Sequence, residues 1–311
     1  MKSRDINLDL IRAVAISFVI LIHSKGTNII YTAVPMFIML SGALVLPKEE
    51  DYKSFYKKRL KRILLPFLIW SPIMYLVLSR TGRIDTPCVG NFFYLLSSTG
   101  VHGAYWYVYE ILGLYLLAPF ISKGIKVLNS KELLLLCFLL LVGYEGFLFF
   151  PDFYFFQSIA WEKSKYVFFF LTGFYIISNR EQLTKSKAVT ITSIIAVVIA
   201  GIVCLYSDLG FKALIPFASI GMFILLLSIP VKVAPPSLSK SLAFGAIQSI
   251  SKYSYGIYLT HPFFIGIFHH VTSLMKLPKG VELLFILAMV LITNTILFWI
   301  IDRFKFGKYL Y

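Results

Sequence analysis

The first apolar segment of the chain carries ionisable side chains at spacings that could support group transfer. Asp9, Arg12 and His23 all fall within residues 8–24. On an α-helix, Arg12 and His23 would lie about 20° from the same face and about 16 Å apart along the axis. One end of that face would carry a cation, and the other an imidazole that can accept a proton. Asp9 precedes Arg12 by three residues and can pair with it.

A second basic pair follows the second apolar segment. Arg59 and Arg62 are three residues apart in the basic run Lys53–Arg62, so they share a helical face. Two planar guanidiniums on one face suit bidentate contacts with phosphates. A simpler interpretation stays open for the basic run and another for Arg12 and His23. The basic run would also serve as an anchor for anionic lipids, while Arg12 and His23 would reach opposite headgroup layers.

Further polar side chains lie within apolar segments later in the chain. Trp106 begins an apolar segment and Glu110 follows one turn later, while His261 stands between Ser254–Thr260 and a proline. Ionisable groups inside a membrane are costly, which makes each a functional hypothesis. Trp106, Glu110 and His261 are therefore supporting candidates. His269 and His270 are interpreted as interfacial side chains, and His102 either as a functional residue or as a solvated loop residue.

The composition indicates a membrane protein. Of 311 residues, 58% are hydrophobic and 14% charged, and the mean hydropathy is +0.80, whereas soluble domains average about 45–50% apolar residues. Apolar runs of about 20 residues can cross the hydrocarbon core. The sequence predicts an all-α polytopic protein with about ten transmembrane helices, at 8–24, 30–47, 62–79, 105–122, 132–150, 164–178, 187–206, 212–230, 253–273 and 281–302.

The distribution of charge predicts the orientation and excludes one class of partner. The net charge is +15, but the basic residues sit mostly in short loops and form no continuous nucleic-acid surface. With ten spans, 21 Lys and Arg residues lie on the side of the termini and eight on the other. The positive-inside rule therefore predicts cytoplasmic N- and C-termini. The cysteines have no metal-ligand spacing, and no metal site is expected: Cys88, Cys137 and Cys204.

Three local patterns refine this outline, which treats residues 1–311 as one integral-membrane domain without a fused soluble domain. Ser41-Gly42 is expected to let another helix backbone approach closely, and Pro35 to loosen the same helix. The apolar stretch Phe92–Leu96, in the longest outside loop, is expected at the membrane surface, and residues 231–252 to form an amphipathic cytoplasmic stretch.

Taken in order, these motifs resemble the acyltransferase 3 family of integral-membrane O-acyltransferases. The resemblance spans residues 7 to about 302. It rests on Asn7–Ala13 with His23, Val34–Phe37 through Ser41-Gly42, the Arg59 and Arg62 pair, Trp106–Pro119, and Ser254–Pro262.

The resemblance implies a multi-pass enzyme of the bacterial cytoplasmic (inner) membrane. Such enzymes move an acetyl or other short acyl group from cytoplasmic acyl-CoA to a hydroxyl of a surface polysaccharide or lipid-linked glycan. His23 would be catalytic, and Arg12, Arg59 and Arg62 would bind the donor. No bound cofactor is implied; membrane lipids and glycan-assembly proteins are the further partners. The alternatives are a transporter or flippase for a lipid-linked sugar, and a module that supplies acyl groups to a partner enzyme.

Overall fold

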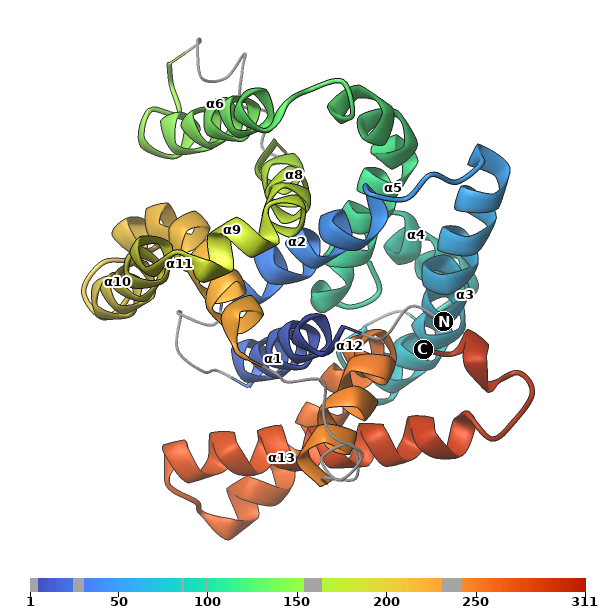
Figure 1. Ribbon diagram of the computed structural model, residues 1–311. Coiled ribbons are helices and arrows are strands. Elements are labelled where there is room, and N and C mark those ends of the chain that lie inside the picture. Colours follow the sequence, from blue (N-terminus) through green and yellow to red (C-terminus); the bar gives the residue numbers. More distant parts are fainter. Residues whose placement is uncertain (1–4, 25–30, 85–86, 99, 154–163, 231–241) are drawn as a thin grey trace.

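The computed structural model describes residues 5–24, 31–84, 87–98, 100–153, 164–230 and 242–311, and the regular elements in these ranges are all helices (Figure 1). The predicted all-α fold is confirmed. The helices are α1 (Ile6–His23), α2 (Ala33–Val45), α3 (Tyr52–Arg80), α4 (Val89–Ser97), α5 (Trp106–Ile125), α6 (Ser130–Phe149), α8 (Ser164–Ser178), α9 (Arg180–Lys185), α10 (Lys187–Val203), α11 (Asp208–Ser228), α12 (Leu242–Met275) and α13 (Lys279–Ile301), with the short turns η2 (Gly103–Tyr105) and η3 (Gly307–Tyr309).

Each of the ten predicted segments falls on one of these helices. Five stretches are long and apolar enough to cross a membrane: Ile6–His23, Tyr52–Arg80, Gly103–Ile125, Ser130–Phe149 and Lys279–Ile301. Shorter apolar stretches lie in α2, α8, α10 and α11. The total of ten crossings and the cytoplasmic side of the termini stay predictions.

Polar caps explain where several helices begin. The Asp5 side chain accepts from the backbone N–H groups of Asn7 and Leu8 at the start of α1. At α6, Asn129 and Glu132 form a reciprocal capping box. These side chains satisfy N–H groups that the helix leaves unpaired. The caps fix the ends of helices that hydropathy alone locates only loosely.

Several predicted boundaries differ from the observed ones. α3 begins at Tyr52 rather than at residue 62, because the basic run is itself helical, and the Asp51 side chain caps it at Ser54. Hydropathy registers only the apolar part of such a helix. The predicted loosening at Pro35 is wrong, since this proline lies in the first turn of α2, where its missing N–H breaks no helical hydrogen bond.

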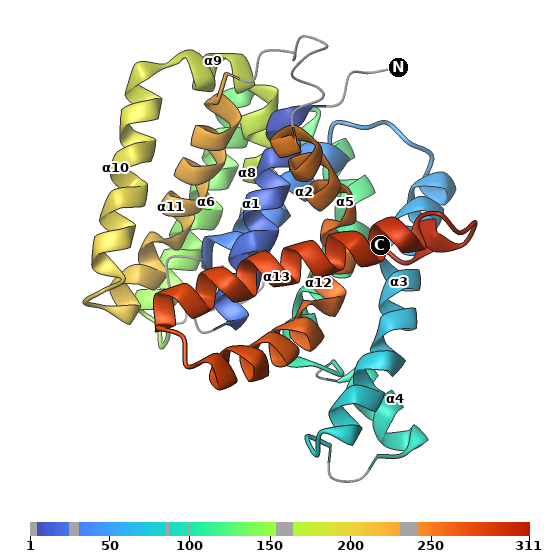
Figure 2. The same cartoon turned by 90° about the horizontal axis from the view of Figure 1, so that it is seen from below.

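The structure can also be compared with the predictions for two segments outside the predicted membrane spans. Residues 92–96 belong to α4, which lies at the end of the bundle opposite to the start of α1 (Figure 2). Its apolar residues Val89, Phe93 and Tyr94 are exposed, as suits a helix at a membrane surface. Of the predicted stretch 231–252, residues 242–252 form the first turns of α12, and residues 231–241 lie outside the described ranges.

Glycines let α2 and α8 pack backbone to backbone. A Cβ added at Gly42 would lie 1.8 Å from the carbonyl oxygen of Phe170, and one at Gly173 would lie 1.9 Å from that of Met39. No side chain fits at either distance. Close approach through small residues is typical of membrane helices, where lipid removes the hydrophobic drive to associate. The prediction for Ser41-Gly42 is confirmed.

Helices α1 and α12 run parallel and pair along their length. Arg12 contacts Ser251 near the start of α1, and His23 contacts His261 at its end. Both partners lie nearly the same number of residues further along the chain, which is the mark of parallel helices in register. Residues near both ends of the chain thus form one helical pair in the middle of the bundle (Figures 1 and 2).

Candidate active site

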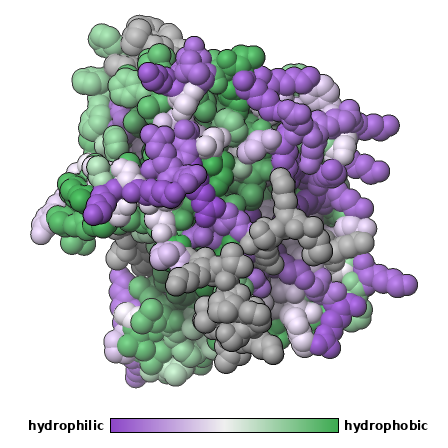
Figure 3. Space-filling view, in the orientation of Figure 1, coloured by the Kyte–Doolittle hydropathy of each residue, from purple (hydrophilic) through white to green (hydrophobic). Residues whose placement is uncertain are grey.

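A wide basic hollow opens at the end of the bundle where α1 and α3 begin. We call it the vestibule; its volume is about 920 Å³. Figure 3 shows hydrophilic side chains gathered on this face, most densely on the side where Figure 1 places α3. Its lining residues are Asp5, Leu8, Asp9, Arg12, Leu44, Lys48, Lys58, Arg59, Lys61, Arg62, Ser251, Lys252, Tyr309 and Tyr311.

Several cations of the vestibule are engaged by neighbouring side chains. Lys58 pairs with Glu50 at 3.6 Å and Lys252 pairs with Asp302. The Nζ of Lys61 donates to the Tyr309 hydroxyl at 3.3 Å. These contacts fix part of the wall and leave other positive charges for a ligand.

Arg59 and Arg62 form no ion pair with a carboxylate among the described residues, and Lys48 is only partly compensated by the charge of Glu50. The Arg59 guanidinium lies 5.4 Å from the Phe55 ring and 6.0 Å from the Tyr115 ring, and its buried Nε has no hydrogen-bond partner in the described part of the chain. Burial, followed by the charge of Arg59, lowers the pKa of Lys48. Uncompensated cations of this kind attract an anion with several charges, such as a group of phosphates.

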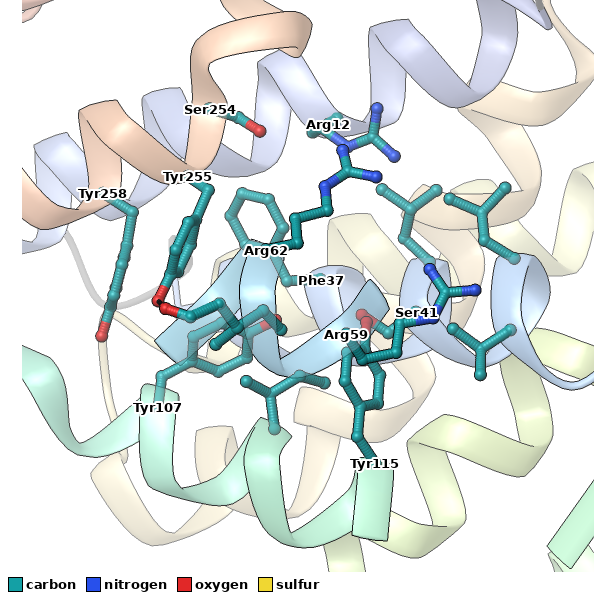
Figure 4. Close-up of a pocket in the computed structure, with 15 residues that line it drawn as sticks. Arg12, Phe37, Ser41, Arg59, Arg62, Tyr107, Tyr115, Ser254, Tyr255 and Tyr258 are labelled. Carbon is teal, nitrogen blue, oxygen red and sulfur yellow. Dashed lines mark hydrogen bonds between the residues drawn. The ribbon is translucent and has the colours of Figure 1, made fainter. Parts of the chain in front are cut away.

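The vestibule narrows into a smaller aromatic cavity, which we call the shaft. Its volume is about 130 Å³. Figure 4 shows guanidinium groups toward one end and the rings of Tyr107, Tyr255 and Tyr258 toward the other. The two spaces share four lining residues: Arg12, Leu44, Arg59 and Arg62. The other residues of the shaft are Phe37, Leu40, Ser41, Val45, Ile63, Tyr107, Ile111, Tyr115, Ser254, Tyr255 and Tyr258.

Arg12 stands at the junction of the vestibule and the shaft and is held from two sides. Its Nη1 donates to the Ser251 hydroxyl at 3.0 Å and lies 3.5 Å from Asp9 Oδ1. Ser251 in turn donates to Asp9 at 2.6 Å. Asp9 and Ser251 are buried, so this network holds the guanidinium in one place while neutralising part of its charge. The predicted pairing of Asp9 with Arg12 is observed.

A layer of tyrosines separates the shaft from the far end of α1. Tyr105 donates to the carbonyl of Leu259 at 2.7 Å, and Tyr258 donates to the carbonyl of Ala104. The rings of Tyr107 and Tyr258 pack edge to face, with centroids 5.5 Å apart. These bonds tie α12 to the start of α5 and close the aromatic end of the shaft.

Beyond this layer, the imidazoles of His23 and His261 are in contact. Their ring centroids are 5.0 Å apart, with the ring planes inclined by 44°. His23 is exposed, whereas His261 is fully buried and its ring lies 5.8 Å from that of Tyr258. His261 thus links the exposed His23 to the tyrosine layer.

Hydrogen bonding defines the free nitrogen of His261. Its Nδ1 lies 2.6 Å from the carbonyl oxygen of Tyr258, so Nδ1 carries the proton and Nε2 is an acceptor. That Nε2 is buried and has no partner among the described residues. An unpaired buried acceptor in ring contact with His23 can accept a proton from it or orient it.

A third histidine caps η2 at the same end. The backbone N–H of Ala104 donates to Nδ1 of His102 at 3.0 Å, which leaves the His102 proton on Nε2. Burial, then the positive charges of His23 and Arg83, lower the pKa of His102 to about 4. At neutral pH His102 is therefore uncharged. Its interpretation as a solvated loop residue is replaced by that of a cap near His23.

The structure brings the predicted residues together in two groups and leaves two outside. Arg12, Arg59 and Arg62 share the junction of vestibule and shaft, and His23 and His261 form the pair beyond the tyrosines. Trp106 packs against Tyr166, with ring centroids 5.8 Å apart. Trp106 and Glu110 line neither of the two spaces. Sequence reasoning missed the residues that connect the groups: Tyr105, Tyr107, Ser251 and Tyr258.

Comparison with known proteins now adds to this geometry. Residues 5–303 match the model of the acyltransferase 3 family, described as an acyltransferase domain. This chain belongs to that family. The expected resemblance is confirmed over nearly the whole sequence, and together with the apolar helices it indicates a bacterial membrane protein of the acyltransferase class.

Related proteins of this family carry a name that concerns export. The chain is 28% identical, over 90% of its length and 84% of theirs, to proteins of Staphylococcus aureus strains MRSA252, MSSA476 and NCTC 8325. Each is named "Probable poly-beta-1,6-N-acetyl-D-glucosamine export protein". No solved structure matches the chain significantly.

Proposed function

We propose that this family member transfers an acetyl or another short acyl group from cytoplasmic acyl-CoA to a hydroxyl of an extracytoplasmic glycan. The observation that carries the proposal is the vestibule that continues into the shaft. Acyl-CoA has a bulky phosphorylated head and a thin arm that ends in the thioester. A wide cationic opening suits the head, and a narrow aromatic cavity suits the arm.

In this proposal the three arginines hold the donor. Arg59 and Arg62 lack carboxylate partners among the described residues, so their charges are available for phosphates. Arg12 marks the entrance of the shaft, where the arm leaves the phosphates. Asp9 and Ser251 position Arg12 and take no direct part in binding.

His23 performs the transfer at the far end of the shaft. Its imidazole accepts the proton of the glycan hydroxyl while the oxygen attacks the thioester carbon; the C–S bond breaks and the CoA thiolate leaves. Alternatively, a nitrogen of His23 attacks the thioester carbon, the C–S bond breaks and the CoA thiolate leaves. The glycan hydroxyl then attacks the acyl carbon, the acyl–nitrogen bond breaks and the hydroxyl proton passes to the imidazole. His261 supports His23 through the contact between their rings. Transfer requires displacement of Tyr258, which closes the shaft before this histidine pair.

We place the vestibule in the cytoplasm and His23 at the outer face of the bacterial cytoplasmic membrane. This arrangement puts each end of the site on the side where its substrate occurs. The charge distribution along the sequence supports it. The partners are acyl-CoA, the glycan, the surrounding lipids and proteins of glycan assembly.

Export of a polysaccharide is the second candidate, since the relatives are named for it. In an exporter, the same intramembrane charges would line a path for the sugar chain. The shaft opposes this candidate: it is narrow, and its tyrosine layer lies between the arginines and the histidine pair. The two functions differ in one measurable requirement, which is the acyl donor.

The two candidates separate in proteoliposomes that contain the purified protein. Acyl-labelled acetyl-CoA is supplied on the vestibule side, and poly-β-1,6-N-acetyl-D-glucosamine oligomers on either side, with and without donor. Acylation predicts label in the oligomer that depends on donor and oligomer together, without net oligomer transport. Donor-independent passage of unlabelled oligomer, without acylation, would establish export and refute the proposal.

A further inference from the structure

The segment that follows α13 folds back over the vestibule. It comprises residues 302–311 and includes η3. Two of its aromatic side chains, Tyr309 and Tyr311, line the vestibule, whose other lining residues include Lys61 and Arg62. The wall of this cationic space is therefore partly aromatic, and the aromatic part comes from this one segment.

Contacts with several helices fix the segment in place. Trp70 Nε1 of α3 donates to the carbonyl of Leu310 at 2.9 Å. The Tyr311 hydroxyl donates to Asp302, and its ring packs edge-on against Tyr253 of α12 at 4.8 Å. The hydrogen bond from Lys252, followed by that from Tyr311, lowers the pKa of Asp302 and keeps it charged as the acceptor. The segment is thus a built part of the vestibule.

Each of the two tyrosines has a lysine ammonium near its ring. The Lys61 ammonium lies 4.3 Å from the centroid of the Tyr309 ring and bonds to its hydroxyl, and the Lys252 ammonium lies 5.6 Å from that of Tyr311. Tyr311 also packs against other rings and anchors the segment, whereas Tyr309 presents a half-buried ring at the vestibule wall beside Lys61. A ring beside cations suits a flat heterocycle that carries phosphates, because the base stacks on the ring while the cations bind its phosphates.

We propose that Tyr309 is the stacking surface for the adenine of acyl-CoA, in a nucleotide subsite completed by Lys61 and Arg62. The inference rests on the proposed donor and adds how its nucleotide is recognised. Arginines alone bind any group of phosphates. A stacked base would distinguish CoA from the phosphopantetheine arm and from a lipid headgroup.

The test compares two ligands on the full-length protein in phosphatidylcholine nanodiscs, whose lipids carry no net charge. CoA contains the adenosine part, and 4′-phosphopantetheine lacks it. Tyr309→Ala is expected to weaken CoA binding by roughly 5- to 150-fold, the equivalent of the roughly 1–3 kcal/mol of one stacked base. Binding of 4′-phosphopantetheine should not change. Tyr309→Phe keeps the ring and should keep the affinity for CoA.

Phe306→Ala is the matched control, because Phe306 belongs to the same segment, is exposed and does not line the vestibule. It should leave both affinities unchanged. An equal loss for both ligands in Tyr309→Ala would reduce Tyr309 to a structural support and overturn the inference. Unchanged CoA binding in that variant would overturn it as well. Wild-type protein that binds neither ligand would refute the proposed donor, a result that Tyr309 variants cannot produce.

Discussion

The two ends of the candidate site differ in their side chains and in how open they are. At the vestibule, arginines and lysines surround a wide hollow, and Arg59 and Arg62 lack carboxylate partners in the described part of the chain. At the far end of α1, two imidazoles meet beside a closed tyrosine layer. One end is open and charged, which suits the proposed binding of the donor; the other is small and holds the imidazoles that are proposed to move a proton or an acyl group.

Under the proposed function, binding and chemistry are therefore separated along α1. Arg12 and His23 lie on one helix but meet different parts of α12, about 16 Å apart along the axis. A change at one end should therefore alter a different kinetic quantity from a change at the other. Substitutions at the two ends test this separation.

The largest effect is expected at the vestibule. Arg59→Ala combined with Arg62→Ala should weaken CoA binding by roughly 3–6 kcal/mol at most, from about 1.5–3 kcal/mol for each charged hydrogen bond. Calorimetry on protein in neutral nanodiscs measures this loss. Lys57→Ala is the control, since Lys57 is exposed in the same basic run but lines neither space. Normal binding with poor membrane insertion would favour the lipid-anchor interpretation.

The next effect is expected at the histidine pair. His23→Ala should reduce acyl transfer by roughly 10²- to 10⁴-fold, the usual contribution of a general base, while CoA binding stays close to that of the wild type. Transfer of labelled acyl groups to the glycan and binding are measured on one preparation. His270→Ala, at an exposed histidine of α12, should change neither. Near-normal transfer by His23→Ala would show that His23 is an interfacial side chain.

A smaller effect is expected at Arg12, where the two spaces join. Arg12→Ala should weaken CoA binding by roughly 1.5–3 kcal/mol, the loss of one charged contact. Arg12→Lys should restore part of it, because a lysine keeps the charge but not the planar fork that also reaches Ser251. Loss of transfer in Arg12→Ala without loss of binding would place Arg12 on the chemical side and weaken the contrast.

The smallest perturbation tests only the orientation of the two ends. Single cysteines replace Lys57, in the basic run, and Tyr206, which is exposed after α10, in a background without native cysteines. A membrane-impermeant thiol reagent should label Lys57→Cys only from the cytoplasmic side and Tyr206→Cys only from outside. Activity should change little. The opposite labelling pattern would reverse the predicted topology and the direction of acyl transfer.

The sequence predicted the helices well because their determinants are local. The lengths of the apolar runs predicted ten segments, which all fall on helices. The small residues Ser41-Gly42 predicted a close contact between helices. The three-residue spacing of Asp9 and Arg12 likewise predicted their pairing. Each of these inferences needs only one helix and its periodicity.

The connections between helices could not be predicted in the same way. The motif around His261 made it a candidate site residue, but its contact with His23 depends on how α12 lies against α1. Ser251 and the tyrosine layer carry no local signal, since a serine or tyrosine in an apolar helix usually only packs. The aromatic wall from residues 302–311 depends on a fold-back that periodicity does not encode.

The parallel pairing of α1 with α12 joins two helices that are synthesised far apart in time. Ser251 follows Arg12 by 239 residues, which a ribosome adds in roughly 12–48 s at about 5–20 residues per second. During that time α1 resides in the bilayer with its ionisable side chains but without the helix that completes them. A chain that stops before α12 contains Arg12 and His23, yet lacks Ser251 and His261, which contact them in the folded protein. Under the proposed function, the site is therefore completed only when α12 docks, late in synthesis.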